Sequence, residues 1–145
     1  MKITEALLAE HLVFHNLFDY LESTVPKLKT LPQIKSLAAL LRVMLDAHSR
    51  TEDELFIGPL EHCFEQIGQR ETFHQDHEDI EESLISAEKA GQSRQARRFL
   101  LAAVVCCRKH FDKEERIVFT MAERVLNTKT LQALGQTWMR QRTHG

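Results

Sequence analysis

Two short stretches of the chain repeat one arrangement of side chains that can hold a cation. "HSRTEDELF" and "HFDKEERIVF" each place a histidine four residues before a glutamate, as His48–Glu52 and His110–Glu114. In a helix this spacing puts both side chains on one face, with Cβ atoms about 5–6 Å apart. Imidazole and carboxylate ligands suit iron, manganese and zinc alike. Each pair could instead be an ion pair on the surface.

An acid-histidine pair precedes each of these stretches. Glu10-His11 comes before the first and Asp76-His77 before the second. Two helix hairpins built on this repeat could pack around a pseudo-two-fold axis. The repeat therefore suggests two metal ions, with the glutamates of the two His-x-x-x-Glu pairs bridging them.

The elements that must position these side chains are helices. Apolar residues at intervals of three and four predict four amphipathic helices, over about 4–25, 32–57, 70–90 and 93–121. Their inner stripes are Leu8, His11, His15, Phe18, Leu21 and Val25; Ile34, Leu37, Leu41, Leu45, His48, Glu52 and Leu55; Phe73, His77, Ile80 and Leu84; and Leu100, Ala103, Cys107, His110, Glu114, Ile117 and Met121. The residues that follow the two glutamates fall off this face and are expected to be solvated. They are Asp53, Glu54, Glu115 and Arg116.

Capping residues and prolines mark the expected helix boundaries. Thr4 and Ser93 are predicted N-caps, Pro32 suits a first turn, and Gly58-Pro59 is expected to stop the second helix. Four long helices with short connections predict an all-α fold, an antiparallel up-down four-helix bundle over about 4–125. A short C-terminal helical extension is expected over about 128–142. The whole chain, 1–145, is predicted to be one domain.

Near the middle of each inner stripe a histidine replaces the expected leucine, at His11, His48, His77 and His110. One such histidine is most often a hydrogen-bonded core residue. A buried imidazole without partners leaves a donor and an acceptor unsatisfied, at about 1–3 kcal/mol each. Four of them at reachable depths favour a metal, which satisfies them together.

Composition excludes several classes of protein. The 145 residues carry a net charge near −2, and the basic cluster "RQARR" is too short to indicate nucleic-acid binding. No apolar run approaches the roughly 20 residues of a membrane span. The acidic start, "MKITEALLAEH", is unlike a secretory signal, and the three cysteines are expected to be reduced thiols. We therefore expect a cytoplasmic protein.

Four elements in order carry a resemblance: "EH" at 10–11, "HSRTEDELF", "DHED" at 76–79 and "HFDKEERIVF". Over roughly residues 4–125 the chain resembles the hemerythrin family, in particular its bacterial His-His-Glu cation-binding domains. The resemblance implies a non-haem di-iron centre, bridged by two carboxylates and an oxo or hydroxo group, that binds dioxygen or nitric oxide. The residues matching the family's ligands are His11, His48, Glu52, His77, His110 and Glu114.

The sequence also departs from this family. Classical oxygen carriers have another histidine one turn before the third-helix ligand, where this chain has Phe73. His74 stands three residues before His77 and is included in the predicted metal set. His15 could be an outer hydrogen-bond donor, a replacement ligand or a core residue. Cys107 is expected to be core packing, and the two other histidines, His62 and His144, are expected on the surface.

Three functions remain open on these residues. The first is a di-iron protein that captures dioxygen or nitric oxide for storage, sensing or stress protection. The second is a di-iron enzyme, with peroxidase-like or oxidase activity or iron donation to damaged centres, for which His15 and Tyr20 are the candidate proton donors. The third is a structural bundle with zinc or no metal. A ferritin-like site would instead need Glu-x-x-His on two helices, whereas here histidine comes first.

Overall fold

The computed structural model describes residues 1–68 and 70–144, and its regular elements are helices. The α-helices are α1 (Ile3–Thr24), α2 (Leu31–Thr51), α3 (Gly58–Gln66), α4 (Arg70–Lys89), α5 (Ser93–Lys113), α6 (Phe119–Val125) and α7 (Thr128–His144). A 3-10 turn follows α1 (Val25–Lys27), and π-helical turns join α2 to α3 (Glu52–Ile57) and α5 to α6 (Glu114–Val118). The predicted all-α class is confirmed for the described residues.

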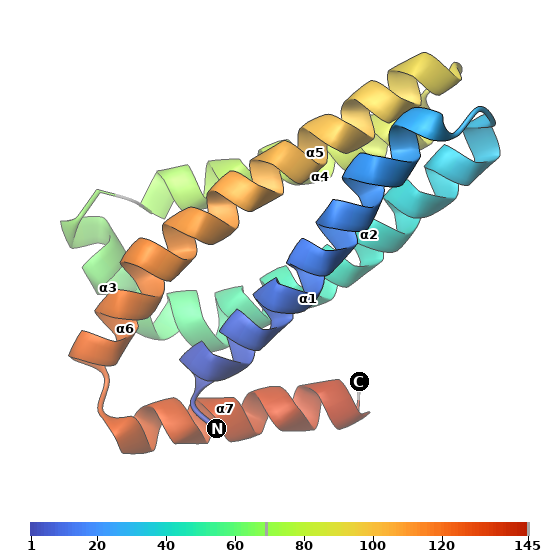
Figure 1. The fold of residues 1–145 in the computed structure, drawn as a ribbon. Helices are drawn as coiled ribbons and strands as arrows, with labels where there is room; N and C mark the ends of the chain where they lie inside the picture. The colour runs from blue at the N-terminus through green and yellow to red at the C-terminus, as the bar shows by residue number, and fades with distance from the viewer. Residues whose placement is uncertain (69, 145) are drawn as a thin grey trace.

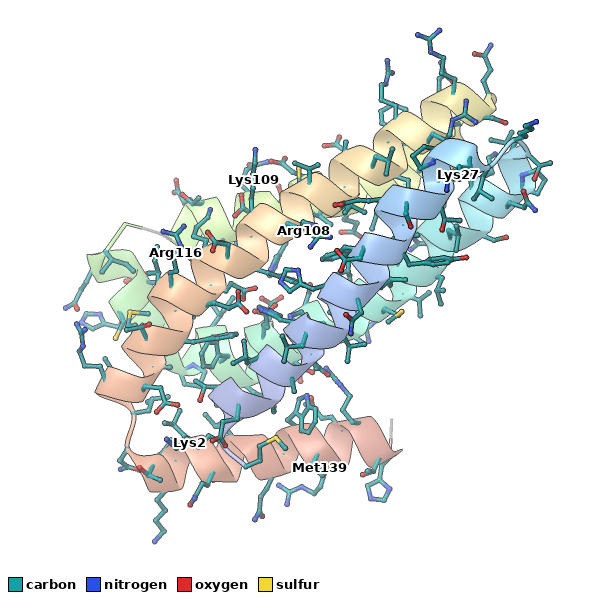
Figure 2. All side chains as sticks on the ribbon, in the orientation of Figure 1. Lys2, Lys27, Arg108, Lys109, Arg116 and Met139 are labelled. Carbon is teal, nitrogen blue, oxygen red and sulfur yellow. The ribbon has the colours of Figure 1, made fainter. Side chains whose placement is uncertain are left out.

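Figure 1 shows α1, α2, α4 and α5 lying side by side, with α7 across the end of the molecule where α1 begins. Helix α4 packs against α5 and α2, whereas α1 contacts α5 and α7. In Figure 2, the labelled residues Lys2, just before α1, and Met139, on α7, lie where these two helices are in contact. None of the helices described is both long and apolar enough to cross a membrane. The cytoplasmic location stays a prediction.

Both predicted N-caps are wrong. Helix α1 begins one residue before Thr4, and α5 begins at Ser93 itself. The hydroxyl of Thr4 donates to the carboxylate of Glu123, and that of Ser93 donates to the carbonyl of Lys29 at 3.1 Å. Each hydroxyl therefore ties its helix to a distant segment, a use that local spacing does not reveal.

The predicted stop at Gly58-Pro59 is also wrong, because the chain stays helical there. The amide of Gly58 donates to the carbonyl of Asp53, five residues earlier, which closes a π-helical turn. Pro59 then lies in the first turn of α3, where its missing N–H is not needed.

The inner faces differ from the predicted stripes by one residue in several places. The prediction for Leu8 is wrong, because this side chain is 41% exposed and Leu7 is buried in its place. Within the π-helical turn Glu114–Val118, the buried side chain is Val118 and Ile117 is only half-buried, because the wider turn shifts the face by one residue. In α1, Phe14 is buried and His15 is half-buried. Burying the phenyl ring avoids the cost of burying a second polar ring on this helix.

Two apolar clusters flank the middle of the molecule. One contains Phe14, Leu45, Ile80 and Phe111 among its buried residues, and the other contains Leu7, Leu55, Phe73 and Val118. The repeated histidines and glutamates stand between these clusters on each long helix. Burial on both sides therefore places these polar side chains in a water-poor layer.

Candidate metal centre

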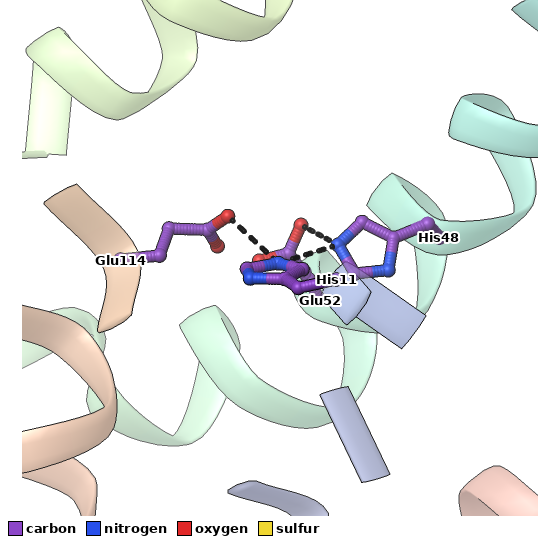
Figure 3. Close-up of side chains that lie close together, drawn as sticks. All are labelled: His11, His48, Glu52 and Glu114. Carbon is purple, nitrogen blue, oxygen red and sulfur yellow. Dashed lines mark hydrogen bonds and ion pairs between the residues drawn. The ribbon is translucent and has the colours of Figure 1, made fainter. Parts of the chain in front are cut away.

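Four side chains from two helices and two π-helical turns converge in the first half of the candidate site (Figure 3). They are His11, His48, Glu52 and Glu114, all buried, and each offers a ligand atom within 4.8 Å of the others. The Nε2 atoms of His11 and His48 are 3.2 Å apart, and His48 Nε2 lies 3.0 Å from Glu52 Oε1. His11 Nε2 is 3.5 Å from Glu114 Oε1.

The second half repeats this arrangement. Glu52, His77 and His110 also offer ligand atoms within 4.8 Å of one another. The Nε2 atoms of His77 and His110 are 2.8 Å apart, and His110 Nε2 lies 3.3 Å from Glu114 Oε1. Glu52 therefore belongs to both groups, and Glu114 reaches a histidine of each half.

Glu10 and Asp76 are the acids of the two acid-histidine pairs. Each binds the Nδ1 atom of the histidine in the following His-x-x-x-Glu pair. His48 Nδ1 is 2.9 Å from Glu10 Oε1, and His110 Nδ1 is 3.0 Å from Asp76 Oδ2. Since a carboxylate only accepts, both Nδ1 atoms carry the proton. In the neutral rings the Nε2 lone pairs then point inward, the arrangement by which carboxylates orient metal-binding histidines.

The acids that follow the two glutamates approach the remaining outer nitrogens. Glu115 Oε1 is 3.7 Å from His11 Nδ1, and Asp53 Oδ1 is 4.0 Å from His77 Nδ1. Asp53 is exposed as predicted, but Glu115 is half-buried, so its expected solvation is wrong. A carboxylate thus faces the outer nitrogen of each of the four histidines.

The inner carboxylates lack hydrogen bonds. Both oxygens of Glu52, both oxygens of Glu114 and Nδ1 of His11 are buried without a hydrogen-bond partner among the described residues. Glu52 lies close to His48 Nε2, but without the geometry of a hydrogen bond. Buried polar atoms left in this state cost about 1–3 kcal/mol each. Two cations between the carboxylates and the imidazoles would satisfy them, so the donor set fits a dinuclear metal centre.

Electrostatics in the metal-free protein follow from burial and these carboxylates. Burial disfavours the charged forms of Glu52 and His48, but their mutual attraction and the Glu10 hydrogen bond to His48 outweigh it. The pKa of Glu52 falls to about 2, and that of His48 rises to about 9. Burial dominates for His11 and His110, whose pKa values fall to about 4. In the metal-free protein the raised pKa of His48 favours its protonated ring, and a cation bound at Nε2 would replace that proton.

Both glutamates lie at the start of a π-helical turn. These turns are rare and are frequently found at functional sites. Each follows directly on the helix that carries the matching histidine, α2 or α5. Each of the two His-x-x-x-Glu pairs therefore has its own π-helical turn.

The sequence matches the Hemerythrin HHE cation binding domain over residues 2–122. The chain belongs to this family. Comparisons with curated proteins and with solved structures gave no match. The resemblance seen in the sequence is thus confirmed, and helix α7 lies beyond the matched residues of this hemerythrin-family chain.

The structure does not bring His74 to the centre. Its side chain is exposed and belongs to neither group of ligand atoms among the described residues, whereas Phe73 is buried and packs edge-on against His110. The inward position one turn before His77 on α4 is taken by Phe73, and this leaves the neighbouring His74 exposed. This part of the predicted metal set is corrected.

The other singled-out residues are placed outside the centre. His15 Nδ1 accepts a hydrogen bond from Arg108 at 3.0 Å, and Tyr20 is 54% exposed. Cys107 lies in an apolar cluster, as predicted, and burial raises the pKa of its thiol. The surface positions predicted for His62 and His144 are confirmed.

A cavity of about 190 Å³ opens onto the second half of the centre. Glu52, His77 and His110 form part of its wall, and Leu45 and Phe111 are among its apolar lining. Sequence reasoning missed this cavity, since it lies between helices. It also missed Glu10 and Asp76 as partners of the second histidine of each hairpin, although the repeated acid-histidine pairs were a signal for them.

Proposed function

We propose that the chain is an antiparallel up-down four-helix bundle that holds two iron ions and binds dioxygen or nitric oxide. His11 and His48 would hold one ion and His77 and His110 the other, and Glu52 and Glu114 would serve both. The observation that carries the proposal is that Glu52 offers oxygen atoms to both groups of ligands. A single-ion site would not need a shared carboxylate with both oxygens left without hydrogen bonds.

The donor set supports iron in its lower oxidation states. Four neutral imidazoles add no negative charge to that of the two inner carboxylates, in contrast to the four carboxylates of ferritin-like sites. When bound, the ions supply reversible coordination of a diatomic ligand. Zinc and manganese accept the same ligand types, so the identity of the metal rests on family membership as well as on this chemistry.

The chain's own residues prepare the place for the diatomic ligand. The cavity reaches His77 and His110, so we assign the ligand to the ion of this half. Leu45, Ile80 and Phe111 make part of its wall apolar, and the charged side chains of Arg42, Asp46, Arg50 and Glu81 make another part of it. Phe73 fills the position where a further histidine would otherwise coordinate this ion.

Binding is favoured over catalysis by the placement of the candidate proton donors. His15 is held by Arg108, and Tyr20 faces solvent. Neither belongs to the two groups of ligand atoms among the described residues. An enzyme that reduces oxygen needs protons delivered at the site.

Mixing the reduced, iron-loaded protein with air or nitric oxide tests the function. A stable coloured adduct is expected for each gas that the centre binds. Rapid autoxidation with turnover of hydrogen peroxide would indicate an enzyme instead. An absorption spectrum that does not change with either gas would contradict the proposal.

A further inference from the structure

We propose that Arg142, on the C-terminal helix, is a positioning residue for the His11–His48 half of the centre. In this role α7 sets how tightly that half holds its cation. The inference rests on the proposed function, since it concerns the same two cations. It goes beyond the family, because Arg142 lies outside the matched residues 2–122.

Arg142 reaches the centre through Glu10. Its Nε donates to Glu10 Oε2 at 2.7 Å, and its Nη2 donates to Glu10 Oε1 at 3.0 Å. The same Oε1 accepts the proton of His48 Nδ1 at 2.9 Å. A two-pronged contact of this kind fixes a carboxylate in position and direction as well as in charge.

The position of Glu10 matters because its side chain has several rotatable bonds and lies at the edge of the molecule. With Arg142 in place, the ring of His48 is held with Nε2 pointing at Glu52 and His11. Without it, Glu10 could turn to solvent and leave Nδ1 without its acceptor. The cation would then have to order the ring of His48 when it binds, and the free energy spent on this ordering lowers the affinity for the cation.

Helix α7 is anchored on the segment that carries His48 and Glu52. The hydroxyl of Thr51 donates to Gln141 Oε1 at 3.1 Å, and Gln141 Nε2 donates to Glu54 at 3.2 Å. Arg142 Nη2 also lies 3.4 Å from the carbonyl of Ala47, the residue before His48. Three contacts therefore tie the end of α7 to the end of α2 and the turn that follows it.

Close backbone packing fixes the other part of α7. A side chain at Gly135 would meet the carbonyl oxygen of Met1 at 2.0 Å, so only glycine allows this approach to the start of α1. Trp138 packs against the neighbouring apolar cluster, and the guanidinium of Arg142 lies 6.0 Å from its ring. The guanidinium is therefore held from both sides.

The second half of the centre is supported differently. Lys113 Nζ donates to Asp76 Oδ2 at 2.6 Å, the oxygen that also binds His110 Nδ1. Lys113 follows His110 by three residues on α5, so this support is local. The cation that supports Asp76 is an ammonium bound to one oxygen, in place of a two-pronged guanidinium, which makes Lys113 a natural comparison for Arg142.

The test compares Arg142→Met, which keeps the aliphatic stem, with Arg140→Met. Arg140 is exposed on the same helix, and its guanidinium donates to the hydroxyl of Thr137, three residues earlier, at 3.0 Å. Zinc alone serves as the probe, with affinities from chelator competition. We expect Arg142→Met to weaken one of the two ions about tenfold, the lower limit for loss of an outer partner, and Arg140→Met to change neither. Lys113→Met should weaken the other ion.

A second readout uses the metal-free protein. Imidazole nitrogen NMR should show faster exchange of the His48 Nδ1 proton with water in Arg142→Met, with the His110 proton unchanged. Arg142→Lys should restore the slow exchange only in part, because an ammonium cannot hold both oxygens.

Equal affinities in Arg142→Met and Arg140→Met, with unchanged exchange at His48, would overturn the inference. Equal weakening of both ions with equal exchange at His48 and His110 would also overturn it, since that indicates general loosening. If wild-type protein binds no pair of ions, the proposed function fails. The exchange measurement then still decides whether Arg142 orders His48 through Glu10.

Discussion

Replacing Glu52 with glutamine should disable both halves of the centre at once. The change keeps the size of the side chain but removes its negative charge and turns one oxygen into an NH2 group. Glu52 is fully buried, belongs to both ligand groups and has no hydrogen-bond partner for either oxygen among the described residues.

Removing a residue that only hydrogen-bonds a metal ligand lowers metal affinity about 10–100-fold. Replacing Glu52, which would bind the metal directly, should lower the affinity by more than this. We take 100-fold as the lower limit, or about 2.7 kcal/mol. Cation-linked stabilisation should fall by that amount at saturating metal. For a chain of this size, each kcal/mol of stability changes Tm by about 2–4 °C. The rise in Tm on adding iron should therefore be roughly 5–11 °C smaller in Glu52→Gln than in wild type.

The assay is thermal unfolding with and without ferrous iron under anaerobic conditions, together with the iron content after gel filtration. Glu82→Gln on α4 is the control, because it removes an exposed carboxylate that belongs to neither group of ligand atoms among the described residues. Equal iron content and equal Tm shifts in Glu52→Gln and wild type would refute the argument that this carboxylate is shared.

The remaining predictions concern single positions and pH. His110→Ala should lose iron from the second half, as counted by metal analysis, and an unchanged iron content would contradict its assignment as a ligand. His74→Ala should keep the wild-type iron content, because this side chain is exposed outside both groups, and loss of an ion would restore it to the metal set. Burial lowers the pKa values of His11 and His110 to about 4, so below the unfolded value of 6.5 the unfolded chain binds more protons than the folded one. The metal-free protein should therefore lose stability as pH falls from 6.5 towards 4, at up to about 1.4 kcal/mol per pH unit for each imidazole, and a constant Tm over this range would contradict the burial argument.

The residues that sequence reasoning placed correctly are those governed by local spacing. His48 and Glu52 share a helix face with Leu41 and Leu45, so periodicity alone put them inside. The same holds for His110 and its glutamate. Where periodicity changed, the prediction failed: the π-helical turns shifted the inner face to Val118 and carried the helix past Gly58.

The residues that sequence reasoning missed act between helices. Glu10 adjoins His11 in the chain but binds His48, and Glu115 adjoins Glu114 but faces His11. Arg142 is 132 positions from Glu10. Such pairs depend on how helices cross, which the spacing within one helix does not determine.

The central claim is that imidazoles and carboxylates from separate helices enclose a pair of iron ions. Anomalous diffraction at the iron edge, from crystals of protein purified without added metal, tests it most directly. Two strong peaks are expected, one between His11 and His48 and one between His77 and His110, with Glu52 and Glu114 next to both. A single peak, or no peak among these six side chains, would contradict it.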